Sequence, residues 1–563
     1  MKQYRWFVLA AFLAIVVAAC GGATEETTTT AGEAATTTTE SEAVTTTTSG
    51  GAFEGQVLDS GGCDYGGKVN TITALDEHTV EFALCSPDPA FLAKIAFGVF
   101  GIQPSEHLEA TEGAPIDNPV GTGPYMLKDW ARGDSVVYEA FPDYYGEKPA
   151  HQTAVLRWAT EGAQRLLELQ SGNVDGITFP STDDYPVIQD DPNLELVNKP
   201  EPNIFYIGFT NTFPPFDNPD VRRAIAMGID RQRIVDTFYP PGSEVASHFT
   251  PCSVEFGCEG DSWYEFDVDA ARQLLADAGF PDGFETTIGY RDVFRGYLPE
   301  PGAVAQDIAA QLQENLNITA EIEVIESGEF IQTTTQGQYQ GIHLLGWTGD
   351  YPHITNFLDF HFNADNPQFG VNDPSYAEPL AEASQMQEPD PALYAEANNA
   401  IKDFVPMVPV VHSVTAFAYA SDVEGAYAPP WGQVQFHLMD NGTDTFVFMQ
   451  GNEPISLYCA DESDGESLRA CAQVVEALYD YDTEGNVVPQ LATECVPNDD
   501  LTVWTCSLRD DVVFHDGSAF DANDVVVSFA AGLDAESPLH VGNSGAFDYY
   551  SYLWDSLINA PEE

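Results

Sequence analysis

The chain has 563 residues, several times the usual length of one small domain. Hydrophobic residues make up 44% of it and aromatic residues 12%, a composition typical of globular parts with sizeable cores. Because 20 lysines and arginines stand against 89 aspartates and glutamates, the formal net charge is −69. So negative a chain repels phosphate groups and anionic lipid surfaces, which argues against nucleic-acid binding and against a polybasic membrane contact.

Residues 1–19 have the pattern of an export signal. A short basic start is followed by an uninterrupted apolar run from Trp6 to Ala19, which is too short for a comfortable membrane span but suits a signal peptide. The run ends in the letters VAAC, which resemble a bacterial lipobox. The resemblance implies cleavage before Cys20 and acylation of its thiol, and several acyl chains give stable anchoring. The alternative is an ordinary secretory signal with an incidental cysteine.

Residues 20–52 form a threonine-rich segment after this signal. The segment contains no large apolar side chain, so it cannot bury enough surface to offset its chain entropy, and we expect a disordered tether. A lipid, a tether and a globular body together predict a protein of the cell envelope. It would be held on the extracellular or periplasmic face of the cytoplasmic membrane through its lipid anchor only.

Eight cysteines remain after the lipidated one, an even number in a chain that we expect to be exported. This parity predicts four disulfides. No CxxC, HExxH or cysteine–histidine cluster indicates zinc, so we expect no metal and no cofactor. Local pairings are favoured, namely Cys63 with Cys85, Cys252 with Cys258, Cys459 with Cys471, and Cys495 with Cys506.

Hydrophobic periodicity predicts alternating strands and helices along the body. The middle of the chain has a β–α–β rhythm, which indicates an α/β lobe with a mostly parallel sheet. The expected elements are a hairpin over 68–85, helices over 91–100, 219–239, 268–279, 303–316 and 390–404, and strands over 125–129, 135–140, 286–290, 319–325 and 407–412.

Six blocks of the sequence after residue 52 carry recognisable motifs. They are NPVGTGPYMLKDWARGDSVVYEAFPDYYGEKP (118–149), FPPFDNPDVRRAIAMGIDRQRIV (213–235), DVDAARQLLADAGFPDGF (267–284), GWTGDYPHITNFLDF (346–360), GNEPISL (451–457) and VVPQLATECVPNDDLTVWTCSLRDDVVFHDGSAFDANDVVVSF (487–529). These blocks resemble the family 5 extracellular solute-binding proteins, which serve oligopeptide, dipeptide and nickel transporters. The resemblance covers nearly everything after residue 52. It implies an α/β, two-lobed, periplasmic-binding-protein-like (type II) fold with an extra subdomain.

The order of these blocks departs from the family. The last two normally open such a protein, whereas here they close it. Because each block appears once, we expect a circular permutation, with the old ends fused near residues 440–446. The expected domains are 53–117 with 459–563 as the extra subdomain of lobe 1, 118–205 with 413–458 as the core of lobe 1, and 206–412 as lobe 2.

The resemblance also implies an interlobe cleft with aromatic walls and one or two charges for a buried ligand. In peptide-binding members of the family, the Asp equivalent to Asp350 receives the α-ammonium group of the ligand. Asp350 inherits that role as a hypothesis, and a surface carboxylate after a core tryptophan is the alternative. The family's Asp-Pro is replaced by His353-Ile354 here, which puts the local turn in question. Trp347, Thr348, Gly349 and Tyr351 are expected beside the ligand.

Further ligand contacts are expected outside that block. Glu453, Ile455 and Ser456 belong to GNEPISL, which resembles a cleft-lining strand whose backbone pairs with an extended peptide. Trp431 is an aromatic candidate near the hinge, with burial in the core as the alternative. Arg291, like Arg295, is a candidate for a ligand carboxylate, although solvated loop arginines are common.

These features predict a monomeric binding protein, not an enzyme, that delivers peptides to an ABC permease with its ATPase subunits. A non-peptide solute, such as an oligosaccharide or a nickel chelate, is an alternative within the family, although the 11 histidines show no paired spacing. A surface sensor with the same fold is another. A secreted hydrolase is disfavoured because neither G-x-S-x-G nor HExxH occurs.

Overall fold

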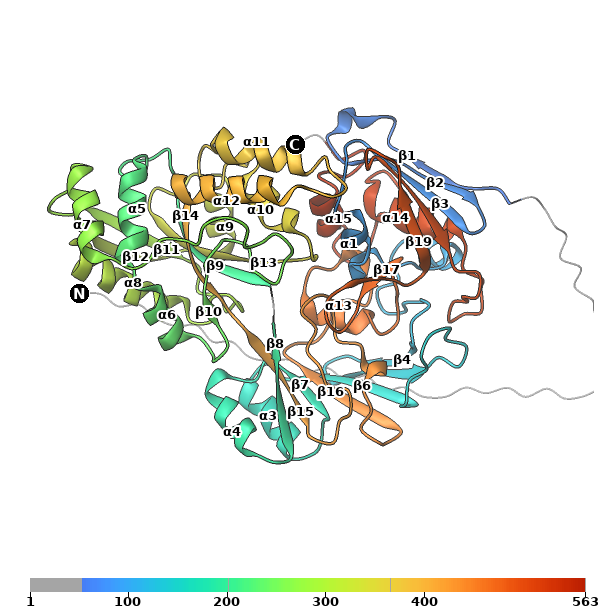
Figure 1. Cartoon of the computed structure of the whole chain (residues 1–563). Coiled ribbons are helices and arrows are strands. Elements are labelled where there is room, and N and C mark those ends of the chain that lie inside the picture. The colour runs from blue at the N-terminus through green and yellow to red at the C-terminus, as the bar shows by residue number, and fades with distance from the viewer. Residues whose placement is uncertain (1–52, 201, 365, 562–563) are drawn as a thin grey trace, which may run out of the picture. The chain divides into compact units, whose positions relative to one another are not determined.

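The computed structural model describes residues 53–200, 202–364 and 366–561, and Figure 1 shows its helices and strands. The export signal, Cys20 and the threonine-rich segment lie outside these ranges. Residues from Phe53 onward cluster as one compact unit that contains three large sheets. Within the described residues, no helix combines the length and the apolar character needed to cross a bilayer.

The first sheet combines strands from both ends of the described chain. It is antiparallel throughout, and β3 pairs with β20 so that Val80 lies opposite Cys506. The period-two pattern of these strands buries alternate residues, and the buried Phe82 ring packs against Phe529 at a centroid distance of 5.3 Å. The order is β1 (Val57–Asp59), β2 (Val69–Asp76), β3 (Thr79–Leu84), β20 (Val503–Leu508) and β19 (Ala492–Pro497).

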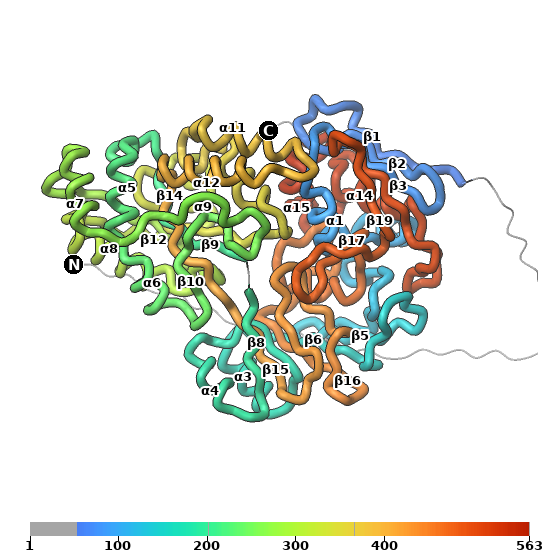
Figure 2. Tube along the Cα trace, viewed as in Figure 1, coloured from blue at the N-terminus to red at the C-terminus, as the bar shows by residue number. Residues whose placement is uncertain are grey.

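Residues near both chain ends contact this sheet. The Gln56 backbone N–H donates to Oδ1 of Asn523 (2.8 Å) in helix α14 (Ala522–Leu533), which covers β2 and β3. The Lys68 N–H donates to the carbonyl of Trp554 (2.8 Å), which follows helix α15 (Asp548–Leu553). Figures 1 and 2 show these blue and red segments side by side. The hairpin at 68–85 therefore packs against the segment 487–529, although about 400 residues separate them in sequence.

Short helices and a small hairpin complete this part of the molecule. The helix expected over 91–100 ends early, as α1 (Phe91–Ile95), and a 3-10 turn at Gly98–Phe100 buries Val99 and Phe100 instead. The remaining elements are α2 (Ser105–Ala110), α13 (Gly465–Cys471) and the hairpin of β17 (Tyr479–Tyr481) with β18 (Val487–Pro489).

The second sheet has seven strands from two separated stretches of sequence. Strand β16 lies parallel to β6 and β7, and the other pairs are antiparallel. Apolar residues of α3 (Gly162–Gln170) and α4 (Tyr185–Asp190) join a core cluster with this sheet. The order is β4 (Tyr125–Ala131), β5 (Ser135–Ala140), β6 (Thr153–Trp158), β16 (Thr445–Gln450), β7 (Gly176–Thr178), β15 (Thr415–Ala420) and β8 (Leu194–Lys199).

The third sheet is mixed, so the prediction of a mostly parallel sheet is wrong. Strands β11, β12 and β13 are parallel because helices carry the chain back between them. Strands β9 and β14 join without such crossovers and pair antiparallel. The order is β10 (Glu244–Val245), β14 (Met407–His412), β9 (Asn203–Phe209), β13 (Ile342–Thr348), β11 (Glu285–Tyr290) and β12 (Thr319–Val324).

Eight helices of the described chain accompany this sheet. The single helix expected over 219–239 is two helices, because Asp230 leaves the helical conformation and accepts a hydrogen bond from the Arg233 N–H (3.0 Å) as the cap of the second. They are α5 (Pro219–Gly228), α6 (Arg231–Phe238), α7 (Val268–Asp277), α8 (Pro301–Leu316), α9 (Ser327–Thr335), α10 (Leu358–Phe362), α11 (Pro374–Ala383) and α12 (Pro391–Phe404).

The chain passes between the second and third sheets twice, once after β8 and once after β14. The buried Asn203 side chain ties the two crossings together. Its Nδ2 donates to the carbonyl of Ser413 (3.1 Å), and its Oδ1 accepts from the Ser413 N–H (2.9 Å). The crossings are thus hydrogen-bonded to each other.

All four expected disulfides are present, with the expected pairings. Cys495 lies directly opposite Cys506 in the β19–β20 ladder. His248 lies near Cys252 and Cys258, and these three form the one cluster with metal-ligand proximity in the described part of the chain. Because the two cysteines form a disulfide with each other, only the histidine of this cluster is available as a metal ligand.

Candidate ligand-binding cavity

A cavity of about 550 Å³ lies at the carboxyl end of β13. Its walls come from β13, from the loop after β11, and from helices α9, α10 and α15. Most of its lining is aromatic or aliphatic, with a few charged groups. Trp347 stacks on Phe360 at a centroid distance of 4.7 Å, and Tyr552 packs edge-on against Phe360 at 5.1 Å. Such a mixture suits a ligand with both apolar and charged groups.

Asp350 supplies a carboxylate to this cavity. The Tyr549 hydroxyl donates to its Oδ1 (3.2 Å), and Asn356 Nδ2 lies 3.4 Å from its Oδ2. Burial raises the pKa of Asp350 to about 6, although the hydrogen bonds from Asn356 and Tyr549 oppose the rise. Within the described chain, no lysine, arginine or histidine forms an ion pair with this carboxylate. The Asp350 carboxylate therefore has no positively charged partner among the described residues.

The turn after β13 fixes the position of Asp350. The buried Asn356 accepts hydrogen bonds at Oδ1 from the Asp350 N–H (2.9 Å) and from Trp347 Nε1 (3.1 Å). The His353 side chain accepts from the Thr355 N–H (3.3 Å) and so caps the 3-10 turn that carries Asn356. The family's Asp-Pro is thus replaced by a histidine cap that still orders this turn.

Two arginines line the same cavity. Arg291 donates from Nη1 to Ser327 Oγ (3.2 Å) and from Nη2 to the Tyr297 hydroxyl (3.3 Å). Arg295 donates from Nη1 to the carbonyl of Phe294 (2.8 Å). Neither guanidinium group has a carboxylate partner among the residues described. The cavity therefore holds both signs of charge, each without a protein counter-ion.

A smaller pocket of about 210 Å³ adjoins this cavity. The two spaces share Thr348, Asp350, Ser463 and Tyr549 as wall residues. Gly349 and Trp431 line only the smaller pocket, where a Cβ atom on Gly349 would lie 2.7 Å from Cζ3 of Trp431. Glycine at this position therefore allows the indole ring to pack against the backbone.

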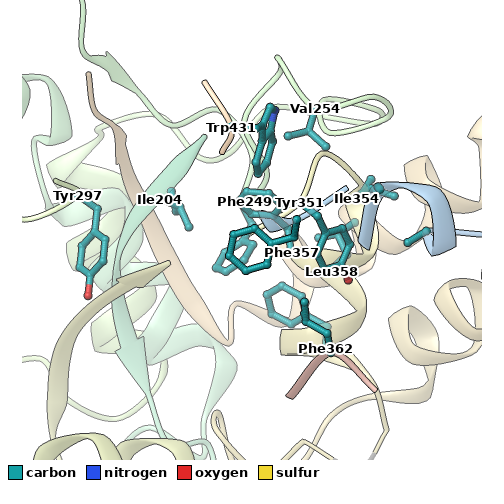
Figure 3. Close-up of a cluster of buried hydrophobic side chains, with 14 of the residues drawn as sticks. Ile204, Phe249, Val254, Tyr297, Tyr351, Ile354, Phe357, Leu358, Phe362 and Trp431 are labelled. Atoms are coloured by element: carbon teal, nitrogen blue, oxygen red, sulfur yellow. The ribbon is translucent and has the colours of Figure 1, made fainter. Parts of the chain in front are cut away.

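The structure brings together most residues of the GWTGDY block, but not all of them. Trp347, Thr348, Asp350 and Arg291 line the large cavity, while Gly349 and Trp431 line the smaller one. Tyr351 points elsewhere and lines neither. Its ring is 5% exposed and lies in a buried cluster with Ile354, Phe357 and Leu358 (Figure 3), because neighbouring side chains in a non-helical segment point in different directions.

The strand expected at GNEPISL is absent, which corrects the expectation for Glu453, Ile455 and Ser456. Pro454 has no N–H to donate, and the Ile455 N–H donates to Ser467 Oγ (2.7 Å), so the segment cannot offer a free strand edge. Glu453 instead accepts from the Gly133 N–H (3.1 Å), and Ser456 is fully buried. None of the three residues lines the two spaces beside Asp350.

Several wall residues were missed in the sequence. Tyr549 and Tyr552 lie in α15, and Ser463 precedes α13, in each case more than 100 residues beyond the GWTGDY block. The run FDYYSYLW is dense in aromatic residues, but its period does not show which rings face a ligand. Only the long-range packing of α15 against the turn after β13 reveals them.

Comparison with known proteins agrees with this architecture. A family model described as bacterial extracellular solute-binding proteins, family 5 middle, matches residues 31–369 and 486–549. A dipeptide-binding protein of Pseudomonas aeruginosa is 29% identical over 387 residues, which cover 66% of this chain and 72% of that protein. Heme-binding protein A of Haemophilus influenzae is 27% identical over 380 residues, covering 66% and 69% respectively.

A solved structure agrees as well. HbpA2 from Haemophilus parasuis is 27% identical and superposes with a TM-score of 0.61, covering 66% of this chain and 75% of that one. The fold is thus the α/β fold of periplasmic binding proteins. The family match spans more than half of the sequence, and its members are binding proteins rather than enzymes. The chain belongs to family 5 of the bacterial extracellular solute-binding proteins.

Proposed function

We propose that this protein binds short peptides in the 550 Å³ cavity. The observation that carries the proposal is the presence of opposite charges in one cavity: among the described residues, Asp350 has no cationic partner, and Arg291 and Arg295 have no anionic one. Burying an ionised group without a partner costs several kcal/mol. A ligand with an ammonium group at one end offsets that cost at Asp350, and a carboxylate at its other end pairs with the half-buried Arg291 and the exposed Arg295.

Each group has a definite part in this proposal. Asp350 accepts hydrogen bonds from the ligand ammonium, while Tyr549 and Asn356 hold its carboxylate in place. Arg291 and Arg295 donate to the ligand carboxylate, because a planar guanidinium group matches a carboxylate in shape and charge. Trp347, Thr348 and the aromatic walls contact the remainder. No bond is made or broken, so the site requires no catalytic group.

The size of the cavity fits such a ligand. Pockets for small molecules have volumes of about 300–1,000 Å³, and the observed value falls within this range. One relative is named for dipeptides and another for heme. We prefer the peptide because the cavity contains unpaired groups of both signs. Nickel is less suited, since His361 is the one histidine on this wall and its Nδ1 is bonded to the carbonyl of Phe357 (2.8 Å).

Delivery to an ABC permease and its ATPase subunits is the transport role that follows from the family. In this proposal the third sheet, with residues 206–412, forms lobe 2. The second sheet, with 118–205 and 413–458, forms the core of lobe 1, and 53–117 with 459–563 forms its extra subdomain. The two chain crossings near Asn203 and Ser413 support this division. The lobes would close on the peptide by bending at these crossings.

We further propose that the chain is a circular permutant anchored by lipid at Cys20. Support for the permutation comes from the first sheet, which is built from both ends of the chain, and from the two separated segments that match the family model. The old ends would be joined near residues 440–446, where an exposed bend at 442–444 leads into β16. Support for the anchor comes from the lipobox-like letters VAAC before the tether.

The proposed function is tested by calorimetric titration of protein that has been freed of co-purified ligand by unfolding and refolding. We expect Ala-Leu to bind with one-to-one stoichiometry. N-acetyl-Ala-Leu and Ala-Leu-amide should each bind about tenfold or more weakly, because each lacks one end charge. Heme is the competing ligand. Tight heme binding without dipeptide binding would contradict the proposal.

A further inference from the structure

The smaller pocket beside Asp350 has its own buried cation. Arg469 lies in α13, lines this pocket and is 5% exposed. Its Nη1 donates to Gln450 Oε1 (3.0 Å), and its guanidinium carbon lies 5.8 Å from the centroid of the Phe417 ring. Its Nε is buried and has no hydrogen-bond partner. Among the described residues, no carboxylate forms an ion pair with it.

Arg165, another buried arginine in the same part of the molecule, serves as a comparison, because its donors are satisfied by the protein itself. It donates four hydrogen bonds to backbone carbonyls, among them those of Thr178 (3.1 Å) and Phe179 (2.7 Å). Arg469 is buried to a similar extent, but its guanidinium group donates a single hydrogen bond within the described chain, to the side-chain oxygen of Gln450. A buried cation with donors to spare is costly unless an anion joins it. The donors of Arg469 are therefore available to a ligand anion.

The position of this pocket relates that anion to the peptide. Asp350 and Tyr549 form part of the wall of both spaces, so an ammonium group bound at Asp350 stands where the two spaces meet. The α-carbon of a peptide's first residue carries the ammonium group, the side chain and the rest of the peptide. With the ammonium at Asp350 and the peptide directed into the large cavity, the side chain is left to enter the smaller pocket.

We propose that the smaller pocket receives the side chain of the ligand's first residue, and that Arg469 pairs with a carboxylate there. This inference rests on the proposed peptide function. It predicts a preference for peptides that begin with glutamate or aspartate, a specificity that Asp350 alone does not give. Phe179, Phe417 and Trp431 exclude water from the pair and so strengthen it.

Other charges line the pocket and bear on this proposal. Lys199 adds a second cation to the wall, whereas Glu466 adds an anion. A Cβ atom on Gly451 would lie 3.1 Å from Oε1 of Glu466, which places this carboxylate next to the loop after β16. Glu466 is partly exposed and Arg469 is buried, so solvent screens the anion more than the cation. Once Asp350 is paired with the ligand ammonium, Arg469 and Lys199 stand against Glu466 on the pocket wall, so the pocket favours an anion.

The test compares isosteric dipeptides on the unaltered protein by calorimetry. Glu-Leu and Gln-Leu differ by one charge at the first side chain, and Leu-Glu and Leu-Gln differ in the same way at the second. We expect Glu-Leu to bind about 10- to 100-fold more tightly than Gln-Leu, with the second pair equal within about twofold. This comparison needs no variant, so a folding defect cannot obscure it.

A variant then assigns the preference to one residue. Arg469→Gln should reduce the Glu-Leu to Gln-Leu affinity ratio to about one, and Arg469→Lys should restore part of it. Arg157→Gln is the matched control for loss of a distant positive charge. Arg157 lies on β6, forms an ion pair with Glu168 (3.6 Å) and lines neither space. It should keep the parental ratio.

The outcomes separate this inference from the function on which it rests. If Glu-Leu and Gln-Leu both bind the parent with equal affinity, the Arg469 pocket is overturned while peptide binding stands. An unchanged ratio in Arg469→Gln would also overturn it. If none of the four dipeptides binds the parent, both the pocket and the proposed function are overturned.

Discussion

The hydroxyl of Tyr549 lies 3.2 Å from Oδ1 of Asp350, although 199 positions separate these residues in the chain. The bond joins α15, near the C terminus, to the turn that follows β13. It also orients the one acidic group in the large cavity that has a clearly raised pKa. A helix from the last part of the described chain therefore takes part in the candidate site.

The pKa of Asp350 predicts how peptide affinity depends on pH. Burial raises this pKa to about 6, and pairing with an ammonium group would lower it again, so binding releases a proton in acidic solution. Affinity should thus rise with pH by up to about tenfold per pH unit in the acidic range. The rise should end at about pH 6–7, and affinity should change little just above that. Calorimetry of Ala-Leu between about pH 4.5 and 7.5 checks this. The Asp350→Asn variant should lack the acidic slope, and an equal slope in both proteins would contradict the assignment.

The raised pKa of Asp350 also predicts that its carboxylate lowers the stability of the ligand-free fold near neutral pH. A raised carboxyl pKa means that the folded state holds the proton more tightly than the unfolded state, so the stability of the fold declines as pH rises from about 3.8 through about 6. Asp350→Asn should therefore stabilise the ligand-free protein near pH 7 by about 1–3 kcal/mol and have little effect near pH 4. Chemical denaturation at the two pH values measures this. Destabilisation by the variant at pH 7 would show that the carboxylate supports the fold.

The permutation can be tested by reversing it. Residues 561 and 53 would be joined by a flexible glycine–serine linker of about 15 residues, and the chain opened between Gly442 and Thr443, which lie in an exposed bend. We expect a folded protein with the parental dipeptide affinity. As a control, opening within β13 should abolish folding, because this strand is hydrogen-bonded on both sides. Failure of the relinked protein to fold would contradict the permutation.

Lipid anchoring is tested at the cysteine that ends the signal. Cys20→Ala should release the protein from membranes into the soluble fraction, since no acyl chain would remain. Fractionation followed by immunoblotting measures the distribution. Cys252→Ala is a suitable control, because that cysteine lies in the globular part and pairs with Cys258. Membrane retention of the Cys20 variant at the parental level would contradict the anchor.

Local patterns in the sequence predicted much of the fold. The hairpin at 68–85, the strands at 125–140 and the four disulfides depend on neighbours in sequence, and they are present. The mixed third sheet was not predicted, because periodicity does not report the direction in which β9 and β14 pair. The split of the helix at 219–239 follows from Asp230, whose capping role competes with helix continuation.

The site was predicted less completely than the fold. The GWTGDY block located Asp350, but nothing in it shows that Tyr351 turns away into a buried cluster. The strand expected at GNEPISL is absent because Ser467 takes the Ile455 N–H, a contact that depends on the position of α13. Tyr549, Ser463 and Arg469 reach the two spaces through packing between distant segments. Such contacts are set by tertiary structure and leave no local signal.

The most direct test of the central claim is a cross-over between one residue and one ligand group. The affinities of Ala-Leu and N-acetyl-Ala-Leu would be measured for the parent and for Asp350→Asn, which has nearly the same shape but no charge. We expect acetylation to cost the parent about tenfold or more and the variant much less, because only the parent pairs with the ammonium group. Equal losses on acetylation in the two proteins would contradict the claim that Asp350 receives the peptide's amino terminus.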